Sequence, residues 1–418
     1  MKRRIVALGA ALALAITPLT ACSSSDDGSG TSGEKKKVTV WMYPVIADSG
    51  KSEQFWSQTE KDFEAKNPNI DLNIELQPWD GRDEKIATAI ASGKGPNLVL
   101  LGPDQIPQYH ASGGLKSAKG GIDDQSKFLP SAIEAATVDG DIYAVPIYHT
   151  ITTTVYNKKA FTDAGISSLP TTWEEVKAAA PKLAAKGVAV MDYSGDPSMT
   201  LNLSFYPLLW QAGGKVFNED GKTVAFNSAE GKETLQFLVD LQKAKGLPAD
   251  AATKPNKVEG GGLASGKTAM GYALNKTEAE VMVKALGKDA VEVGMPLKGK
   301  EQVTFGLPGL LTRTSIGKDD ESANTALKYL SSADVAAKLA KEAGFFPARS
   351  DATVDASDPM NATFQKALEY ARAGEVNPKA RQVMAALVPH LQAALQGKKT
   401  VDQALSDAEK ECNDLLKG

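Results

Sequence analysis

Apolar and polar residues alternate along residues 70–76, where the apolar positions are Ile70, Leu72, Ile74 and Leu76. A period of two is the signature of a half-buried β-strand. Residues 53–66 follow a different rule, because four of their side chains recur at helical spacing and share one face, namely Phe55, Trp56, Thr59 and Phe63. This segment predicts a helix that precedes the strand.

The same two patterns continue along the chain. Short apolar runs at residues 38–41 and 98–101 predict two further strands, and residues 84–92 and 105–112 predict two helices. Strand, helix, strand, helix, strand is the order of a parallel sheet with crossover helices, so we expect an α/β fold. In such sheets, ligands bind beyond the carboxyl ends of the strands.

The first residues have the composition of an export signal. The chain begins Met1-Lys2-Arg3-Arg4, is apolar over residues 5–16 and reaches Cys22 after small residues. The apolar run falls short of the roughly 20 residues that span a bilayer. We therefore expect a signal peptide over residues 1–21 that is removed after export.

Residues 19–22, Leu-Thr-Ala-Cys, resemble the bacterial lipobox. That resemblance implies a diacylglyceryl group on the thiol of Cys22 and a further acyl chain, such as palmitate, on its amine. Two lipid chains anchor a protein stably, whereas one gives marginal binding. We expect a lipoprotein on the extracytoplasmic face of a bacterial cell membrane. The alternative is a soluble secreted protein in which the cysteine stands there by chance.

A polar segment separates the predicted anchor from the body. Residues 22–37 are rich in Ser, Gly and Asp and predict a flexible tether with an end-to-end distance of roughly 20 Å. About 380 residues follow, which is more than one compact core accommodates and suits two lobes. The second cysteine, Cys412, has no partner once Cys22 is lipidated, so we expect a free thiol.

The charge of the chain argues against nucleic acid as a partner. The formal net charge is −4, and loss of Lys2, Arg3 and Arg4 with the signal peptide makes it −7. Binding to phosphates requires clustered Lys and Arg. The one basic cluster, residues 35–37, ends the tether, where solvation and contact with anionic lipid headgroups both explain it.

The middle of the chain carries a series of motifs. Thr172 and Glu175 form a capping box that predicts a helix from Trp173 to about Lys186. The motifs are Gly140-x-x-Tyr143-x-x-Pro146, Tyr156-Asn157-Lys158, Ala164-Gly165-Ile166, Pro170-x-Thr172-Trp173-x-Glu175, Trp210-x-x-Gly213-Gly214, Gly266-Lys267-x-Ala269-Met270 and Gly344-x-x-Pro347-x-Arg349. Together they resemble the extracellular solute-binding lipoproteins of carbohydrate ABC importers (family 1), of the maltose-binding-protein type.

This resemblance implies a type II periplasmic-binding-protein fold, in which two lobes, each a sheet flanked by helices, are joined by a three-segment hinge. The expected parts are residues 38–147 plus 308–345 in lobe 1, residues 152–303 plus 349–418 in lobe 2, and hinge segments near 147–152, 303–308 and 345–349. Such lobes close around a ligand that contacts both. The implied partners are a sugar and the permease subunits of an ABC importer, and we expect a monomer without a cofactor.

The chain departs from the family pattern at two places that usually face ligand. Phe305-Gly306-Leu307-Pro308 stands where paired glycines are common, and Tyr272 stands where a Trp is common. These differences concern the identity of the solute more than the fold.

A sugar offers hydroxyl groups and apolar C–H faces, so its site requires aromatic platforms and a few polar groups. Such side chains follow the first three predicted strands, lie at the expected crossings or match family positions near the cleft. The candidate contacts are Trp41, Tyr43, Trp79, Asp80, Asp104, Tyr148, His149, Trp210, Tyr272 and Arg349. Trp56 and Trp173 are explained as packing residues.

Other readings of the chain remain open. Residues 261–268 fit the phosphate-loop pattern, but a polar loop precedes them and an apolar strand pattern follows, the reverse of what that site requires. Asp80 and Asp104 would suit a lipid-anchored glycoside hydrolase, although carboxylates also bind sugars without catalysis. The same fold could carry a polyamine, a peptide or a ferric ion. The three histidines lie far apart, so no zinc site is expected.

Overall fold

The computed structural model describes residues 35–417 except for residues 47, 353 and 356. Cys22 and the predicted signal peptide lie outside this part of the chain. Among the described residues, no helix combines the length and apolar character needed to cross a membrane.

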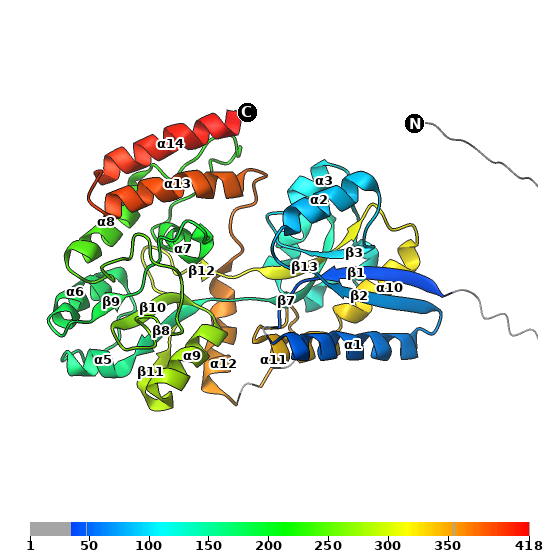
Figure 1. Cartoon of the computed structure of the whole chain (residues 1–418), viewed down its shortest axis with the longest axis horizontal. Coiled ribbons are helices and arrows are strands. Elements are labelled where there is room, and N and C mark those ends of the chain that lie inside the picture. The colour runs from blue at the N-terminus through cyan, green and yellow to red at the C-terminus, as the bar shows by residue number, and fades with distance from the viewer. Residues whose placement is uncertain (1–34, 47, 353, 356, 418) are drawn as a thin grey trace, which may run out of the picture. The chain divides into compact units, whose positions relative to one another are not determined.

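The first sheet has six strands, in the order β2-β1-β3-β13-β4 with β7 also paired to β13 (Figure 1). Its strands are β1 (Lys36–Met42), β2 (Ile70–Leu76), β3 (Leu98–Leu101), β4 (Leu115–Lys116), β7 (Ala144–His149) and β13 (Pro308–Thr314). The pairs of β1 with β2 and β3 are parallel, whereas β13 is antiparallel to its neighbours. The late strand β13 therefore completes a sheet that the first hundred residues begin.

Helices connect these strands as the alternating pattern predicted. They are α1 (Ser49–Lys66), α2 (Arg82–Ser92), α3 (Ile106–Ala111), α4 (Pro130–Ala135), α10 (Asp320–Leu330) and α11 (Ala333–Ala343), with short 3₁₀ turns η1 (Lys119–Gly121) and η2 (Gln125–Lys127) and a hairpin of β5 (Thr137–Val138) and β6 (Asp141–Ile142). The apolar faces of the sheet and its helices form one core, which includes Val40, Phe63, Leu100 and Leu311.

The second sheet has four strands in the order β11-β8-β10-β9. They are β8 (Thr153–Asn157), β9 (Ala189–Met191), β10 (Thr268–Leu274) and β11 (Val291–Val293). The surrounding helices are α5 (Lys158–Asp163), α6 (Trp173–Ala184), η3 (Leu201–Leu203), α7 (Phe205–Gln211), α8 (Ala229–Lys243), α9 (Lys276–Leu286), η4 (Lys288–Ala290), α12 (Pro359–Ala367), η5 (Leu368–Tyr370), α13 (Ala380–Leu395) and α14 (Val401–Lys417). A separate core under this sheet includes Phe205, Trp210, Leu238 and Leu387.

Several segment predictions are confirmed. Strands β2 and β3 have the predicted bounds. The capping box of α6 forms, with the Glu175 backbone N–H donating to Thr172 and the Glu175 carboxylate accepting from the Thr172 N–H. Helix α1 begins earlier than predicted, at Ser49, because the Asp48 carboxylate caps it by accepting from the Lys51 N–H at 2.8 Å.

Other predicted boundaries differ from the observed ones by one to three residues. Strand β1 begins at Lys36, inside the segment predicted as tether, because Lys36 pairs with Ile70 in the parallel ladder. Helix α6 ends at Ala184 rather than at Lys186. The buried Cys412 is a free thiol, as predicted, and burial raises its pKa to about 12.

Three segments cross between the two sheets, and they bond to one another. Thr150 N–H donates to Leu307 O and Thr152 N–H to Phe305 O, each at 2.9 Å. In the third segment, Phe346 exchanges backbone hydrogen bonds of 2.6 and 2.9 Å with His149. Figure 1 shows β7 and β13 running from the first sheet toward β12 (Thr304–Phe305), which pairs with β14 (Ala371–Arg372). The two lobes are therefore joined by a hydrogen-bonded bundle of three segments.

Gly309 in β13 lies against the ring of Tyr148 in β7, at the lobe 1 end of this bundle. A Cβ atom at Gly309 would lie 2.1 Å from the Tyr148 ring. We expect Gly309→Ala to lower the free energy of unfolding by about 1–3 kcal/mol, because the ring must leave its position. Urea unfolding measures this loss.

Gly50→Ala is the matched control, since the nearest atom to a Cβ there, in the Asp48 carboxylate, is 3.5 Å away. It should change stability by less than about 0.5 kcal/mol. Equal urea midpoints for the two variants would show that the close approach of Gly309 to Tyr148 does not constrain the pairing of β13 with β7.

Candidate functional site

An aromatic pair stands where the first two strands of lobe 1 end. Tyr43 directly follows β1, and Trp79 lies in the loop between β2 and α2. Their rings are stacked, with centroids 4.8 Å apart and planes inclined by 24°. Tyr43 is buried, whereas Trp79 keeps 46% of its surface exposed. Trp79 is thus an exposed aromatic platform supported from behind by a buried ring.

Charged groups at the start of α2 flank this pair. The guanidinium of Arg82 lies 4.9 Å from the centroid of the Tyr43 ring and 5.2 Å from that of Trp79. Arg82 also donates to the side-chain oxygen of the buried Gln105, which in turn donates to Asp83 Oδ1 at 2.6 Å. Asp83 lies in the first turn of α2, where the helix dipole favours a negative charge. The result is a carboxylate held in a fixed position beside the aromatic platform.

Asp104, in the loop that follows β3, joins the same group of side chains through Arg381. Arg381 Nε donates to Asp104 Oδ2 at 2.8 Å, and Arg381 Nη1 donates to Asp83 Oδ2 at 2.7 Å. Burial lowers the pKa of Arg381, but the two carboxylates outweigh it and the pKa is raised. Since Arg381 belongs to α13 of lobe 2, these ion pairs connect the lobes directly.

Trp210 lies at the end of α7 in lobe 2 and is fully buried. Its Nε1 donates to Glu375 at 3.0 Å, and the guanidinium of Arg372 lies 4.7 Å from its ring centroid. Arg372 and Glu375 also form an ion pair of 2.9 Å. The edge and one face of Trp210 are therefore occupied by side chains of its own lobe.

Tyr148 and His149 lie at the first crossing, and both are buried. The Tyr148 ring packs on Phe345, with centroids 4.9 Å apart. His149 Nδ1 lies 2.6 Å from Thr150 O, and since a carbonyl oxygen only accepts, Nδ1 is the donor. Burial lowers the pKa of His149 to about 4. The Tyr148 side chain thus packs against the third crossing segment, whereas the His149 side chain bonds within the first.

The remaining candidates occupy other surroundings. Trp41 donates from Nε1 to Glu75 at 2.9 Å, and Asp80 is exposed next to Trp79. Tyr272 is buried, and its hydroxyl donates to Ser204 O at 2.6 Å. Arg349 makes two bonds of 2.8 Å to Asp351 and packs over the Phe128 ring. The structure thus brings together Tyr43, Trp79 and Asp104, and leaves Tyr272 and Arg349 apart from them.

Sequence reasoning missed the charged partners of this group. Arg82 and Asp83 directly follow Trp79-Asp80-Gly81, so a helix start at that position was a signal that could have revealed them. Arg381 lies almost 300 residues away from Asp83, and nothing in its own neighbourhood of the sequence indicates the contact.

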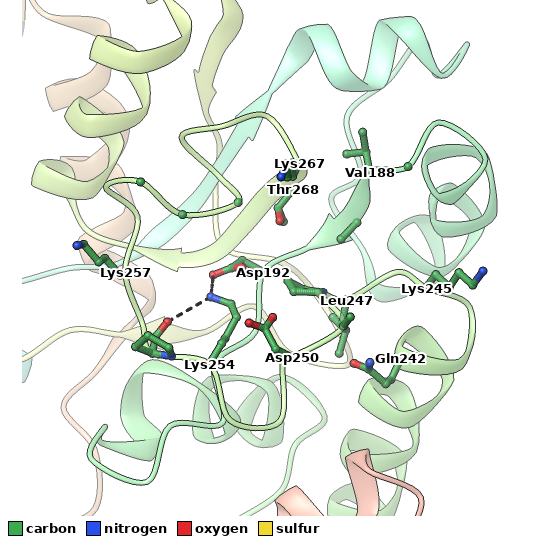
Figure 2. Close-up of a pocket in the computed structure, with 18 of the residues that line it drawn as sticks. Val188, Asp192, Gln242, Lys245, Leu247, Asp250, Lys254, Lys257, Lys267 and Thr268 are labelled. Atoms are coloured by element: carbon green, nitrogen blue, oxygen red, sulfur yellow. Dashed lines mark hydrogen bonds and ion pairs between the residues drawn. The ribbon is translucent and has the colours of Figure 1, made fainter.

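The phosphate-loop pattern at residues 261–268 belongs to a different part of lobe 2. Strand β10 begins at Thr268, so a strand follows the pattern and the order required for phosphate binding is absent there. The segment lines a hollow of about 760 Å³, next to an ion pair of 3.0 Å between Lys254 and Asp192 (Figure 2). All residues that line the hollow lie between 184 and 268, within this single lobe.

Comparison with known families decides the class of protein. Residues 44–342 match the family described as bacterial extracellular solute-binding protein. The chain belongs to this family. The match includes strands of both sheets, whereas β1 and the residues after 342 lie outside it.

Sequence similarity to curated binding proteins supports the assignment of this chain to the solute-binding family. It is 30% identical over 283 residues to the diacetylchitobiose-binding protein DasA of Streptomyces coelicolor, covering 64% of this chain and 63% of the relative. It is 28% identical over 249 residues to a binding protein of Brucella abortus (strain 2308), covering 59% of this chain and 56% of the relative. The chain thus spans less than two thirds of the length of these curated relatives.

The fold has close counterparts among solved structures. The cyclic α-maltosyl-1,6-maltose-binding protein of Arthrobacter globiformis superposes with a TM-score of 0.79 at 23% identity, over 92% of this chain and 99% of that chain. The solute-binding protein therefore has the two-lobe periplasmic-binding-protein fold that the motifs predicted.

His149 gives the solute-binding protein a predictable dependence on pH. The unfolded chain takes up a proton near pH 6.5, whereas the folded chain resists it down to about pH 4. Stability from this residue is therefore complete above pH 6.5 and is lost as the pH falls toward 4, by about 3 kcal/mol in total. Urea unfolding across this range measures the loss.

His149→Gln is the comparison variant, because it removes the titrating group. Its stability should fall less steeply than that of the parent between pH 6.5 and 4. Parallel plots of unfolding free energy against pH for the two proteins would contradict the buried neutral state. So would a His149 ring signal in NMR that titrates near pH 6.5.

Proposed function

We propose that this solute-binding protein captures a neutral carbohydrate between its two lobes and delivers it to an ABC importer. The observation that carries the proposal is the exposed face of Trp79, supported by Tyr43 and flanked by fixed charged groups of Arg82, Asp83 and Asp104. An aromatic platform suits the C–H face of a sugar ring, and oriented carboxylates and guanidinium groups suit its hydroxyls.

The relatives support a hydroxyl-rich cargo. The name of DasA, one of the matched proteins, assigns it an acetylated disaccharide. Polyamine sites instead need several carboxylates against aromatic faces without competing cations. Here Arg82 stands over the aromatic pair and Arg381 already engages both carboxylates, so an uncharged solute is favoured.

Separate apolar cores of the two sheets support a division into lobes. We assign residues 38–147 and 308–345 to lobe 1, and residues 152–303 and 349–418 to lobe 2, with the crossings between them as the hinge. The first core draws on Val38 to Tyr148 and Leu310 to Ala343, which supports this division. A ligand that contacts both lobes would favour the closed arrangement over the open one.

The ligand set that we propose is centred on the platform. Trp79, Asp80 and Asp104 contact the solute, while Tyr43, Arg82 and Asp83 support them. Trp210 is not part of this set, because it is buried against Arg372 and Glu375. The family consists of binding proteins, and we propose that this chain binds its cargo without hydrolysing it.

A thermal-shift screen over sugars, polyols and polyamines tests the cargo, because a ligand of the native state raises its melting temperature. We expect neutral saccharides to give the shift. In the full chain, Trp79→Ala should then weaken binding at least tenfold, since it removes a central aromatic contact. Tryptophan fluorescence titration measures the affinity.

Trp56→Phe is the control, because Trp56 is buried in the lobe 1 core on α1. It should bind like the parent. A rise in melting temperature with polyamines and with no sugar would overturn the proposed substrate class. Release of reducing ends from an oligosaccharide would show that the protein is an enzyme.

Attachment to the membrane by lipid on Cys22 is the second part of the proposal. It rests on the lipobox resemblance of residues 19–22, since Cys22 lies outside the described residues. Cys22→Ser should move the protein from the membrane fraction into the medium or a soluble fraction and abolish labelling by radioactive palmitate.

Cys412→Ser is the matched control, since Cys412 is buried and free. It should keep both the label and the membrane location. Membrane attachment of the Cys22→Ser protein would exclude lipid on that cysteine as the anchor.

A further inference from the structure

Arg381 makes a side-chain contact between the lobes that the carbohydrate site does not require. Its Nε and Nη1 donate to Asp104 and Asp83 at 2.8 and 2.7 Å. Asp83 is in the first turn of α2 and Asp104 precedes α3, whereas Arg381 is in the first turn of α13. Figure 1 shows the positions of these three helices. The crossing segments are joined by backbone, but this contact consists of side chains alone and can break without unfolding either lobe.

On the lobe 1 side of the contact, the Asp83 carboxylate is held in position by residues of its own lobe. The other oxygen of Asp83 accepts from Gln105 at 2.6 Å, and Gln105 accepts from the Gly102 N–H at 2.9 Å. Gln105 is buried, with 3% of its surface exposed. The carboxylate is therefore held ready by groups of its own lobe, so less freedom is lost when the guanidinium binds.

On the lobe 2 side, no acidic residue in the first turn of α13 compensates the positive charge of Arg381. Arg381 is in the first turn of α13, where the helix dipole disfavours a cation, and that turn contains no acidic residue. The neighbouring Lys379 is turned to the carbonyl of Leu415 in α14. The carboxylates of lobe 1 supply the compensating charge for Arg381.

We propose that Arg381 is an interlobe clasp, which draws the two lobes together before the solute arrives and remains closed around the bound solute. The clasp raises the fraction of protein in the binding-competent arrangement. The apparent dissociation constant equals the intrinsic constant divided by that fraction, so the clasp strengthens binding without touching the solute. The affinity part of this inference rests on the proposed function, whereas the part about the unliganded protein does not.

The alternative is that Arg381 only occupies the carboxylates until sugar hydroxyls displace it. The two cases have opposite consequences. A clasp that persists makes Arg381 favourable for binding, whereas a displaced guanidinium makes it a competitor, so that its removal would tighten binding.

Small-angle scattering of the unliganded protein tests the clasp without any sugar. At low ionic strength we expect Arg381→Gln to have a larger radius of gyration than the parent. In about 1 M salt the parent should approach the variant, since ion pairs at this exposure are screened. The double variant Asp83→Asn with Asp104→Asn should open in the same way, and adding Arg381→Gln to it should change nothing further.

Lys379→Gln is the control, because it removes a positive charge two residues away whose partner is in lobe 2. It should scatter like the parent. Circular dichroism establishes that each variant is folded. A folded Arg381→Gln protein with the parent's radius of gyration at every salt concentration would overturn the clasp.

Calorimetric titration with the saccharide found by screening gives the second measurement. Arg381→Gln should raise the dissociation constant about threefold to tenfold, as expected for the loss of two partly exposed ion pairs. The salt dependence of affinity should be present in the parent and lost in the variant. An unchanged or lower dissociation constant would overturn the persistent clasp. Failure of every variant to bind any saccharide would count against the proposed function, and the scattering result would still decide the clasp.

Discussion

The bonding among the three crossing segments is the constraint on which the rest of the structure depends. Thr150 and Thr152 pair with Leu307 and Phe305, and His149 pairs with Phe346, so no crossing moves independently of the others. Each lobe has its own sheet and core, so a bend at the crossings does not require either core to open. Such a connection permits hinge motion of rigid lobes and little else, which is the motion that a solute-binding protein uses.

The position of the aromatic platform follows from the same arrangement. Tyr43, Trp79 and Asp104 all follow strands of one sheet, at the edge where parallel strands place their carboxyl ends. The N-terminus of α2 adds Arg82 and Asp83 there, and α13 adds Arg381 from the other lobe. The ends of these strands and the start of α2 thus form one polar and aromatic surface on lobe 1. The crossing segments place this surface opposite lobe 2.

The sequence predicted the parts that depend on neighbouring residues. Period-two alternation located β2, and the capping box located the start of α6, because both signals are local. A family motif says which residue stands at a position but not where its side chain points. Tyr272 and Arg349 were candidates on that ground, and in the structure they bond to Ser204 and Asp351. The partners of Arg381 depend on tertiary packing and gave no signal in the sequence.

A crystal structure with the saccharide that gives the largest thermal shift would show where the solute binds. We expect one molecule of saccharide between the lobes, with its ring against Trp79 and hydrogen bonds to side chains of both lobes. Saccharide bound within a single lobe, for instance in the hollow beside Lys254 and Asp192, would contradict this expectation, because such a ligand cannot drive closure.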